Sequence, residues 1–295
     1  MPSPQKIVKA VIPAAGFGTR MLPATKALPK EMLPVAGKPL IQYAIEEAAA
    51  SGIETAILVV RNRKSLIQSH FDPDPALESF LRDRQLTTVA AVIHRLTELV
   101  DLQYVEQQQP FGLAHAICCA RPLIGDEPFV VLLPDVIMVN DEPVTRQLIG
   151  AYKNQCGSVV AIREVEPQEV GRHGIVQVPR STTAASAATV RIVGLVEKPS
   201  GANAPSRLGV FGRYVLEPVI WDAIEQTSPD ARGEVQLTDA LNVLCQRSSV
   251  LGLCFEGRHY DAGEPLGYLK AHIELSLGDP LLRQPLREYL TRLLA

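Results

Sequence analysis

A glycine-rich turn followed by basic residues lies near the N-terminus and constrains this chain more than any other segment. An apolar run, Val8 to Ile12, leads into the small-residue sequence AAGFG at residues 14–18, and Thr19 and Arg20 follow. Glycine and alanine let backbone N–H groups approach a bulky anion closely, and a turn of such groups forms an anion-binding concavity. The segment therefore predicts a buried strand that ends in a phosphate-binding turn.

Positive charge is concentrated in the same segment. Residues 1–40 contain one acid, Glu31, and six basic residues: Lys6, Lys9, Arg20, Lys26, Lys30 and Lys38. This segment carries a net charge of +5, whereas the whole chain carries −3. Because arginine and lysine supply forked or mobile positive charge to phosphate oxygens, the charge pattern also predicts a phosphate site.

The glycine motif differs from the two common phosphate-binding motifs. GxxxxGK[ST] is absent, and the dinucleotide fingerprint GxGxxG fails at Met21. A bare GxG after a strand is equally compatible with a tight strand-to-loop turn. The longer string G-x-G-T-R-x-x-P-x-T-x-x-x-P-K-x-x-x-P, however, resembles the signature of nucleoside-diphosphate-sugar pyrophosphorylases. Its ending, PKEMLPVAGKPLIQY, resembles the bacterial UTP–glucose-1-phosphate uridylyltransferases.

Composition limits the class of protein. A chain of 295 residues is long enough for one large α/β domain or two small ones. The near balance of 29 basic and 32 acidic residues argues against a nucleic-acid binder. The five cysteines contain no CxxC pair, which favours reduced thiols in a cytoplasmic protein. No stretch approaches the roughly 20 apolar residues of a membrane helix, so we expect no membrane partner.

Strands and helices alternate through the first half of the chain. Apolar runs predict buried parallel strands at 8–12, 55–60, 102–106 and 129–133. Helical patterns occur at about 39–51, 62–70, 76–100 and 112–121, and the third is broken at a point that the pattern does not locate. This alternation predicts an α/β fold with a Rossmann-like, mixed and mostly parallel sheet flanked by helices.

The second half is richer in strands. Strands are predicted at 159–165, 174–178, 189–196, 208–216 and 250–255, helices at about 217–226 and 234–247, and a polar, mobile loop at 179–189. The tail predicts two helices around Gly278-Asp279-Pro280. We expect one nucleotidyltransferase domain over 1–295, with a nucleotide-binding half at about 7–158, a sugar-binding half at about 159–264 and C-terminal helices at 265–295.

The family resemblance extends to residues at the predicted carboxyl ends of the strands, where such sheets bind ligands. It implies that the nucleotide is cradled by Ala14, Ala15, Gly16, Gly18 and Thr19. The pattern Q-x-x-x-x-G-L-A-x-A contains Gln107 and Gly112, which read the pyrimidine base in the family. Taken alone, Gln107 is only a polar residue at a strand end. Phe111 departs from the family, which usually has lysine there.

Two aspartates match the family's metal ligands. Asp135 ends the motif Leu-Pro-Asp after the fourth predicted strand, and Asp261 belongs to the motif Tyr-Asp-Ala-Gly. Magnesium is usually held by one or two carboxylates together with phosphates and waters. A lone aspartate after a strand is more often a turn former, but two of them beside a phosphate loop favour an Mg²⁺ site.

The resemblance also supplies candidate sugar-binding residues. In the motif Val-Glu-Lys-Pro, Glu197 would accept hydrogen bonds from sugar hydroxyls and Lys198 would meet the sugar phosphate. Gly174 would lie against the sugar ring. Glu234 and Gln236, in GEVQLTD, would support the sugar pocket, although acids in a first helical turn are favoured by the helix dipole alone.

Together these matches cover residues 7 to about 275 and imply one reaction. UTP and glucose 1-phosphate would give UDP-glucose and pyrophosphate by Mg²⁺-assisted in-line attack at the α-phosphorus. Arg20, Lys30, Asp135 and Lys198 would be the catalytic residues, acting by charge neutralisation and positioning.

Two alternatives remain open on sequence alone. A related enzyme could use dTTP or another sugar 1-phosphate, because base selectivity depends on a single methyl group. A catalytically weak paralogue could instead bind a nucleotide sugar and regulate a partner, although such proteins usually lose a charged site residue. The leucine-rich C-terminal helices would suit a homodimer or homotetramer.

Overall fold

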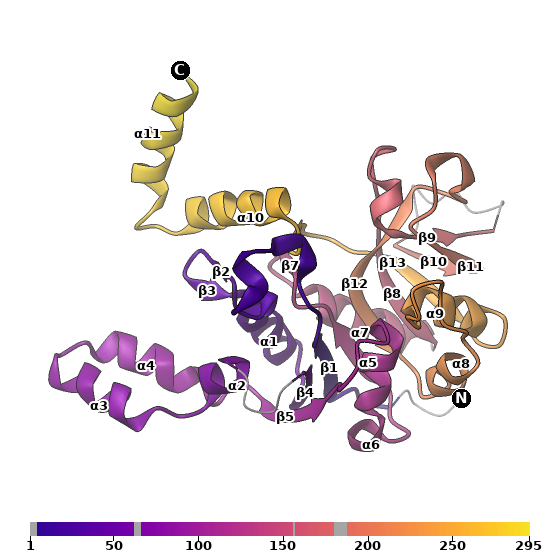
Figure 1. Ribbon diagram of the computed structural model, residues 1–295, viewed down its shortest axis with the longest axis horizontal. Coiled ribbons are helices and arrows are strands. Elements are labelled where there is room, and N and C mark those ends of the chain that lie inside the picture. Colours follow the sequence, from indigo (N-terminus) through magenta and orange to yellow (C-terminus); the bar gives the residue numbers. More distant parts are fainter. Residues whose placement is uncertain (1–4, 62–65, 156, 180–187) are drawn as a thin grey trace.

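The computed structural model describes residues 5–61, 66–155, 157–179 and 188–295. A ten-stranded sheet forms its centre (Figure 1), with the main strand order β10-β13-β8-β12-β6-β1-β4-β5, and β9 pairs with β11 and β12. The strands are β1 Lys9–Ala14, β4 Thr55–Val60, β5 Asp101–Glu106, β6 Phe129–Leu132, β8 Ser158–Glu164, β9 Gly174–Gln177, β10 Thr189–Ile192, β11 Gly194–Glu197, β12 Leu208–Leu216 and β13 Val250–Cys254.

The direction of the strands matches the predicted fold class. β1 is parallel to both β4 and β6, β5 is parallel to β4, and β13 is parallel to β8. The long strand β12 is antiparallel to β6 and β8 and joins the two parallel portions into one sheet. The predicted α/β fold with a mixed, mostly parallel sheet is therefore confirmed.

Helices cover both faces of this sheet. Alternate residues of β1 enter opposite cores: Ile12 belongs to the core that includes Ile45 of α1, whereas Val11 belongs to the core that includes Ile117 of α5 and Trp221 of α8. The helices are α1 Leu40–Ala50, α2 Leu66–Phe71, α3 Pro75–Asp83, α4 Thr87–Leu96, α5 Leu113–Cys119, α6 Arg121–Ile124, α7 Val144–Gln155, α8 Ile220–Glu225, α9 Leu237–Cys245, α10 Pro265–Gly278 and α11 Arg283–Leu294. Each large aliphatic side chain buried in this way contributes about 1.5–3 kcal/mol.

Several elements differ from the sequence expectations. The helix expected at 76–100 is two helices, α3 and α4, separated by a turn in which Gln85 has φ +60°. The strand expected at 189–196 is two strands, and α7 was not predicted. The start of the helix expected at 62–70 and most of the loop at 179–189 lie outside the described residues.

A short antiparallel pair lies outside the main sheet. Strands β7 (Val136–Val139) and β14 (Arg258–Asp261) pair so that Asp261 lies opposite Val136. Neither strand was predicted, because a run of four residues has little periodicity. The pairing brings together two chain segments whose paired residues are 119 to 125 positions apart in sequence.

The remaining elements surround this core. Two very short strands, β2 Pro34–Val35 and β3 Lys38–Pro39, pair with each other, and single turns of 3₁₀-helix occur at Thr19–Met21 (η1) and Lys30–Met32 (η3). The α3–α4 pair projects at the lower left of Figure 1, and α11 projects at its upper left. In the part of the chain that the structure describes, no helix combines the length and apolarity needed to cross a membrane.

Candidate active site

Two cavities lie side by side where β1, β5 and β6 end. The first has a volume of about 370 Å³ and the second of about 560 Å³. Both are lined by Thr19, Leu113, Leu133, Asp135 and Glu234. One ligand could therefore extend from the first cavity into the second past Asp135.

The glycine-rich turn forms one wall of the first cavity. Gly18 has φ +61°, and a Cβ there would lie 3.0–3.2 Å from atoms of Lys30 and Thr25, so only glycine fits without strain. The predicted nucleotide-binding residues that line this cavity from the turn are Ala15, Gly16, Gly18 and Thr19. Ala14 does not: it is buried at the end of β1 and lines a separate pocket behind the turn.

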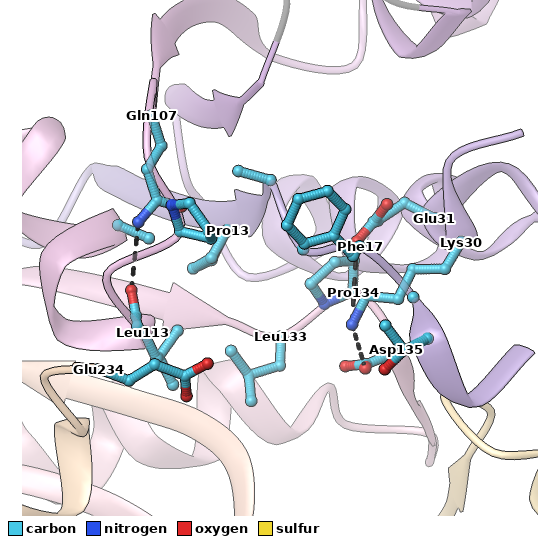
Figure 2. Close-up of a pocket in the computed structure, with 17 residues that line it drawn as sticks. Pro13, Phe17, Lys30, Glu31, Gln107, Leu113, Leu133, Pro134, Asp135 and Glu234 are labelled. Carbon is cyan, nitrogen blue, oxygen red and sulfur yellow. Dashed lines mark hydrogen bonds and ion pairs between the residues drawn. The ribbon is translucent and has the colours of Figure 1, made fainter. Parts of the chain in front are cut away.

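Gln107 and Gly112 lie together at the other end of the first cavity. The Gln107 side-chain amide donates to the carbonyl oxygen of Gly112 at 3.2 Å (Figure 2). Gly112 has φ +99°, and a Cβ there would lie 2.6 Å from the carbonyl oxygen of Val235. The glycine is thus required by the close approach of the segment that carries Glu234, a packing reason that the sequence did not reveal.

Lys30 lies between two carboxylates. Its Nζ donates to Oδ2 of Asp135 at 2.6 Å and lies 3.9 Å from Oε1 of Glu31 (Figure 2). Burial alone would lower the pKa of Lys30, but the charges of Asp135 and Glu31 outweigh it and raise this pKa. Lys30 is therefore a fixed positive charge at the junction of the two cavities.

Glu31 is a residue that the sequence analysis did not select. Its side chain is fully buried, and neither carboxylate oxygen has a hydrogen-bond partner among the described residues. Burial raises the pKa of Glu31 to about 7, against the opposing charge of Lys30. Its position beside Lys30 in the motif Pro-Lys-Glu was the only available signal, and burial cannot be read from that motif.

Arg20 bridges the two predicted metal ligands. Its guanidinium nitrogens lie 3.9 Å from Oδ2 of Asp135 and 3.8 Å from Oδ2 of Asp261. Burial would raise the pKa of Asp135, but the charges of Lys30 and Arg20 hold it below its usual value. Burial and then the charge of Asp135 raise the pKa of Asp261. The two carboxylates thus repel each other and favour a cation between them.

The donor set at this point fits a hard divalent cation. No cluster of three or more His, Cys, Asp or Glu side chains suited to a metal exists within the described ranges. Two aspartates are nevertheless the usual protein contribution to an Mg²⁺ site, whose other ligands are phosphate oxygens and water. The structure therefore fits a metal that is bound together with a phosphorylated substrate.

The second cavity contains the predicted sugar-binding residues. Gly174, Glu197, Lys198, Glu234 and Gln236 all line it, together with Arg20 and Asp261. Oε2 of Glu197 accepts a hydrogen bond from the Thr238 hydroxyl at 2.6 Å, and its Oε1 lies 2.8 Å from the Lys198 ammonium. A Cβ at Gly174 would lie 3.0 Å from that hydroxyl, so glycine leaves room beside this pair.

Lys198 has an unusual backbone conformation. Its φ of +41° is in the left-handed region, and its N–H donates to the carbonyl oxygen of His173 at 3.1 Å. Such a conformation costs of order 1 kcal/mol or more for a residue with a side chain and is most often found at functional sites. It turns the Lys198 side chain back toward Glu197 at the cavity wall.

Other cavity residues were not identified from the sequence. Tyr214 on β12 is buried, Arg172 and Arg232 are exposed, and Thr238 lies in the first turn of α9; all four line the second cavity. Arg232 forms an ion pair with Asp230 at 3.2 Å. Its place directly before the Gly-Glu of GEVQLTD was a usable signal, whereas Tyr214 lies in a strand and resembles an ordinary core residue.

A sequence model of the nucleotidyl transferase family matches residues 9–276. The chain belongs to the nucleotidyl transferase family. It is therefore a nucleotidyltransferase, as the glycine-rich motif predicted.

Curated relatives of this nucleotidyltransferase carry a more specific name. Two proteins of Bacillus subtilis (strain 168) are named UTP–glucose-1-phosphate uridylyltransferase. One, YngB, is 43% identical over 286 residues, which cover 97% of this chain and 95% of YngB. The other is 42% identical over 290 residues, which cover 98% of each chain. These relatives confirm the resemblance to uridylyltransferases that the sequence motifs indicated.

Solved structures of similar sequence share the fold. A UDP-glucose pyrophosphorylase complexed with UDP-glucose has 37% identity and a TM-score of 0.83, over 93% of this chain and 100% of its own. A UTP-bound UGPase from Acinetobacter baumannii has 37% identity and a TM-score of 0.89, over 97% and 99% of the two chains. The first of these structures contains UDP-glucose and the second contains UTP.

Proposed function

We propose that this nucleotidyltransferase converts UTP and glucose 1-phosphate to UDP-glucose and pyrophosphate. The observation that carries the proposal is the junction of the two cavities at Asp135, where Lys30, Arg20 and Asp261 also meet. Positive charge is gathered where a triphosphate and a sugar phosphate would approach each other. The names of the relatives agree with this reaction.

The first cavity would bind UTP. Gln107 and the Gly112 backbone would contact uracil, whose ring edge offers both a donor and acceptors. The backbone N–H groups of the turn at 15–19 would contact the phosphates. Arg20 and Lys30 would neutralise charge that develops on the departing pyrophosphate, which is the main need of such a transfer.

Asp135 and Asp261 would hold Mg²⁺, which supplies further charge neutralisation at the phosphates in such transfers. Before substrate binds, Arg20 and Lys30 carry the counter-charge for these carboxylates. The Lys30 ammonium has three N–H donors, so besides Asp135 it would also contact a phosphate oxygen.

The second cavity would bind glucose 1-phosphate. Glu197 would accept hydrogen bonds from sugar hydroxyls, Gly174 would leave room for the ring, and Glu234 and Gln236 would support the wall. Lys198 would hold the incoming phosphate against repulsion by the triphosphate. No general base is needed, because a phosphate monoester with a second pKa near 6 is mostly a dianion at pH 7.

We also propose the division of labour along the chain that the sequence suggested. Residues 7–158 would supply most of the nucleotide site, residues 159–264 most of the sugar site, and residues 265–295 the C-terminal helices. The cytoplasmic location and a homodimeric or homotetrameric state stay predictions of the sequence.

Pyrophosphate release with Mg²⁺ tests the proposed reaction. UTP and dTTP are each paired with glucose 1-phosphate, and Asp135→Asn protein, purified in the same way, controls for contaminating activity. A strong preference for UTP is the expected result. A preference for dTTP would instead indicate a thymidylyltransferase. If neither nucleotide reacts while UDP-glucose binds, the protein is a nucleotide-sugar sensor and the proposal is wrong.

A further inference from the structure

A buried arginine lies beneath the loop that carries Asp135. Arg213, on β12, is only 1% exposed, and the carboxylate of Glu47, on α1, is its partner. The Arg213 Nη2 lies 2.7 Å from Oε2 of Glu47, and its Nε lies 3.1–3.2 Å from both carboxylate oxygens. Arginine is suited to such an ion pair because its guanidinium presents several donors in one rigid plane.

The same guanidinium holds the loop on both sides of Asp135. Nη1 of Arg213 donates to the carbonyl oxygen of Leu133 at 2.8 Å, and Nη2 donates to the carbonyl oxygen of Val136 at 2.8 Å. These two carbonyl groups flank Pro134 and Asp135 in the sequence. One side chain therefore fixes the backbone immediately before and immediately after the Pro-Asp segment.

Glu47 is itself held in place from a third element. Its Oε1 accepts hydrogen bonds from the backbone N–H of Thr145 at 3.0 Å and from the Thr145 hydroxyl at 2.7 Å. Thr145 lies in the first turn of α7, and its side chain is buried. Helices α1 and α7 thus orient the carboxylate that orients Arg213.

The contacts continue from Asp135 to the second aspartate. The carbonyl oxygen of Asp135 accepts a hydrogen bond from the N–H of Ala262 at 2.8 Å, and Asp261 lies opposite Val136 in the β7–β14 pair. A shift of the loop at 133–136 would therefore move both carboxylates. Local contacts add to this restraint: the N–H of Val136 donates to the carbonyl oxygen of Leu133 at 3.3 Å, and the N–H of Gly263 donates to Oδ1 of Asp261 at 3.1 Å.

We propose that Arg213 and Glu47 are positioning residues that hold Asp135, and through it Asp261, in the geometry that binds the divalent cation. The inference rests on the proposed metal site. Neither residue lines the two cavities, so neither touches substrate. Replacing groups that orient metal ligands typically costs about 10–100-fold in metal affinity or activity.

A role in stability alone is a poor explanation for this ion pair. The cost of removing two charges from water often cancels their attraction, and apolar replacements of buried pairs are often neutral or stabilising. The two carbonyl contacts, in contrast, are directional and lie at the ends of one functional segment. A positioning role explains why this place holds an arginine, because an apolar residue would fill the same space without contacting the two carbonyl groups.

Metal affinity tests the proposal directly. Arg213→Lys keeps a buried positive charge beside Glu47 but replaces three donor nitrogens in one rigid plane with a single ammonium nitrogen, so the fork that spans Leu133, Val136 and Glu47 is lost. Electron paramagnetic resonance detects free Mn²⁺. The decrease in this signal on binding gives the dissociation constant of Mn²⁺ for the protein–UDP-glucose complex. In Arg213→Lys we expect this dissociation constant to rise about 10–100-fold. The KM for glucose 1-phosphate at saturating metal should stay within about twofold of the wild-type value.

Three controls separate the possible outcomes. Arg207→Lys, just before β12, alters an exposed ion pair with Glu164 and should leave Mn²⁺ affinity unchanged. Glu47→Gln preserves side-chain shape and, like Arg213→Lys, should weaken Mn²⁺ binding. Asp135→Asn should abolish it. If Arg213→Lys and Glu47→Gln lower the Tm but bind Mn²⁺ like the wild type, the positioning role is wrong. If Asp135→Asn binds Mn²⁺ normally, the proposed metal site itself is wrong.

Discussion

The ammonium group of Lys30 lies 2.6 Å from the carboxylate of Asp135, although the two residues are 105 positions apart in the chain. This ion pair joins the 3₁₀-turn η3 to the loop after β6, at the junction of the two cavities. Its charges are opposite and well buried, so each residue stabilises the ionised form of the other. The pair therefore links the proposed phosphate-binding side of the site to the proposed metal side.

Loss of either partner should reduce catalysis strongly. We expect Lys30→Ala and Asp135→Asn each to lower kcat/KM by about 10²–10³-fold, because removing one preorganised charge-stabilising group usually has an effect of this size. Pyrophosphate release measures the change. The exposed Lys26→Ala, from the same basic segment, is a matched control; an equal loss there would mean that only total charge matters.

Lys198 should act on the sugar phosphate. Lys198→Ala is expected to raise the KM for glucose 1-phosphate and to lower kcat, with the KM for UTP nearly unchanged, because the ammonium lies in the second cavity. Initial rates over a grid of both substrates give these values. Kinetics like those of the wild type would remove Lys198 from the mechanism.

Glu31 should make stability depend on pH. The pKa of Glu31 is about 7 in the folded protein, whereas its ordinary value is 4.5. Between pH 4.5 and pH 7 the folded state therefore binds more protons than the unfolded state. The stabilisation of the folded state by this difference in proton binding is complete below pH 4.5 and is lost as the pH rises to 7. Glu31→Gln should therefore gain stability relative to the wild type between pH 5 and pH 8, by roughly 2–3 kcal/mol.

Urea unfolding of both proteins at several pH values measures this difference. Glu54→Gln, which alters an exposed carboxylate paired with Lys6, is the control and should show almost no trend. A constant difference between Glu31→Gln and the wild type across this range would show that Glu31 is already ionised at pH 5.

Gly112 should not tolerate a side chain. Gly112→Ala places Cβ within 2.6 Å of the Val235 carbonyl oxygen, in addition to an unfavourable φ of +99°. Gly125→Ala has a comparable backbone problem, φ +69°, but open space around the new atom. We expect Gly112→Ala to lower the stability by about 1–3 kcal/mol more than Gly125→Ala and to weaken UTP binding. Thermal unfolding measures the difference in stability, and titration calorimetry measures UTP binding.

Much of the fold follows from local patterns. The apolar runs of β1, β4 and β12 predicted strands at nearly the observed positions, and Leu40–Ala50 is the helix that its apolar spacing indicated. The missed helix α7 contains Gly150, which weakens the helical signal. The missed strands β7 and β14 are too short for a period to be seen.

The sequence by itself determined the family, and it predicted the glycine-rich turn and most of the charged residues that line the two cavities, because these depend on short motifs with a fixed order of residue types. Only the tertiary structure decided that Ala14 lies behind the turn, that Glu31 is buried with no hydrogen-bond partner among the described residues and that Arg213 and Glu47 contact the loop of Asp135. Arg213 and Glu47 are 166 residues apart. Burial and such distant pairing arise from how the strands and helices pack, and no local pattern of residues encodes them.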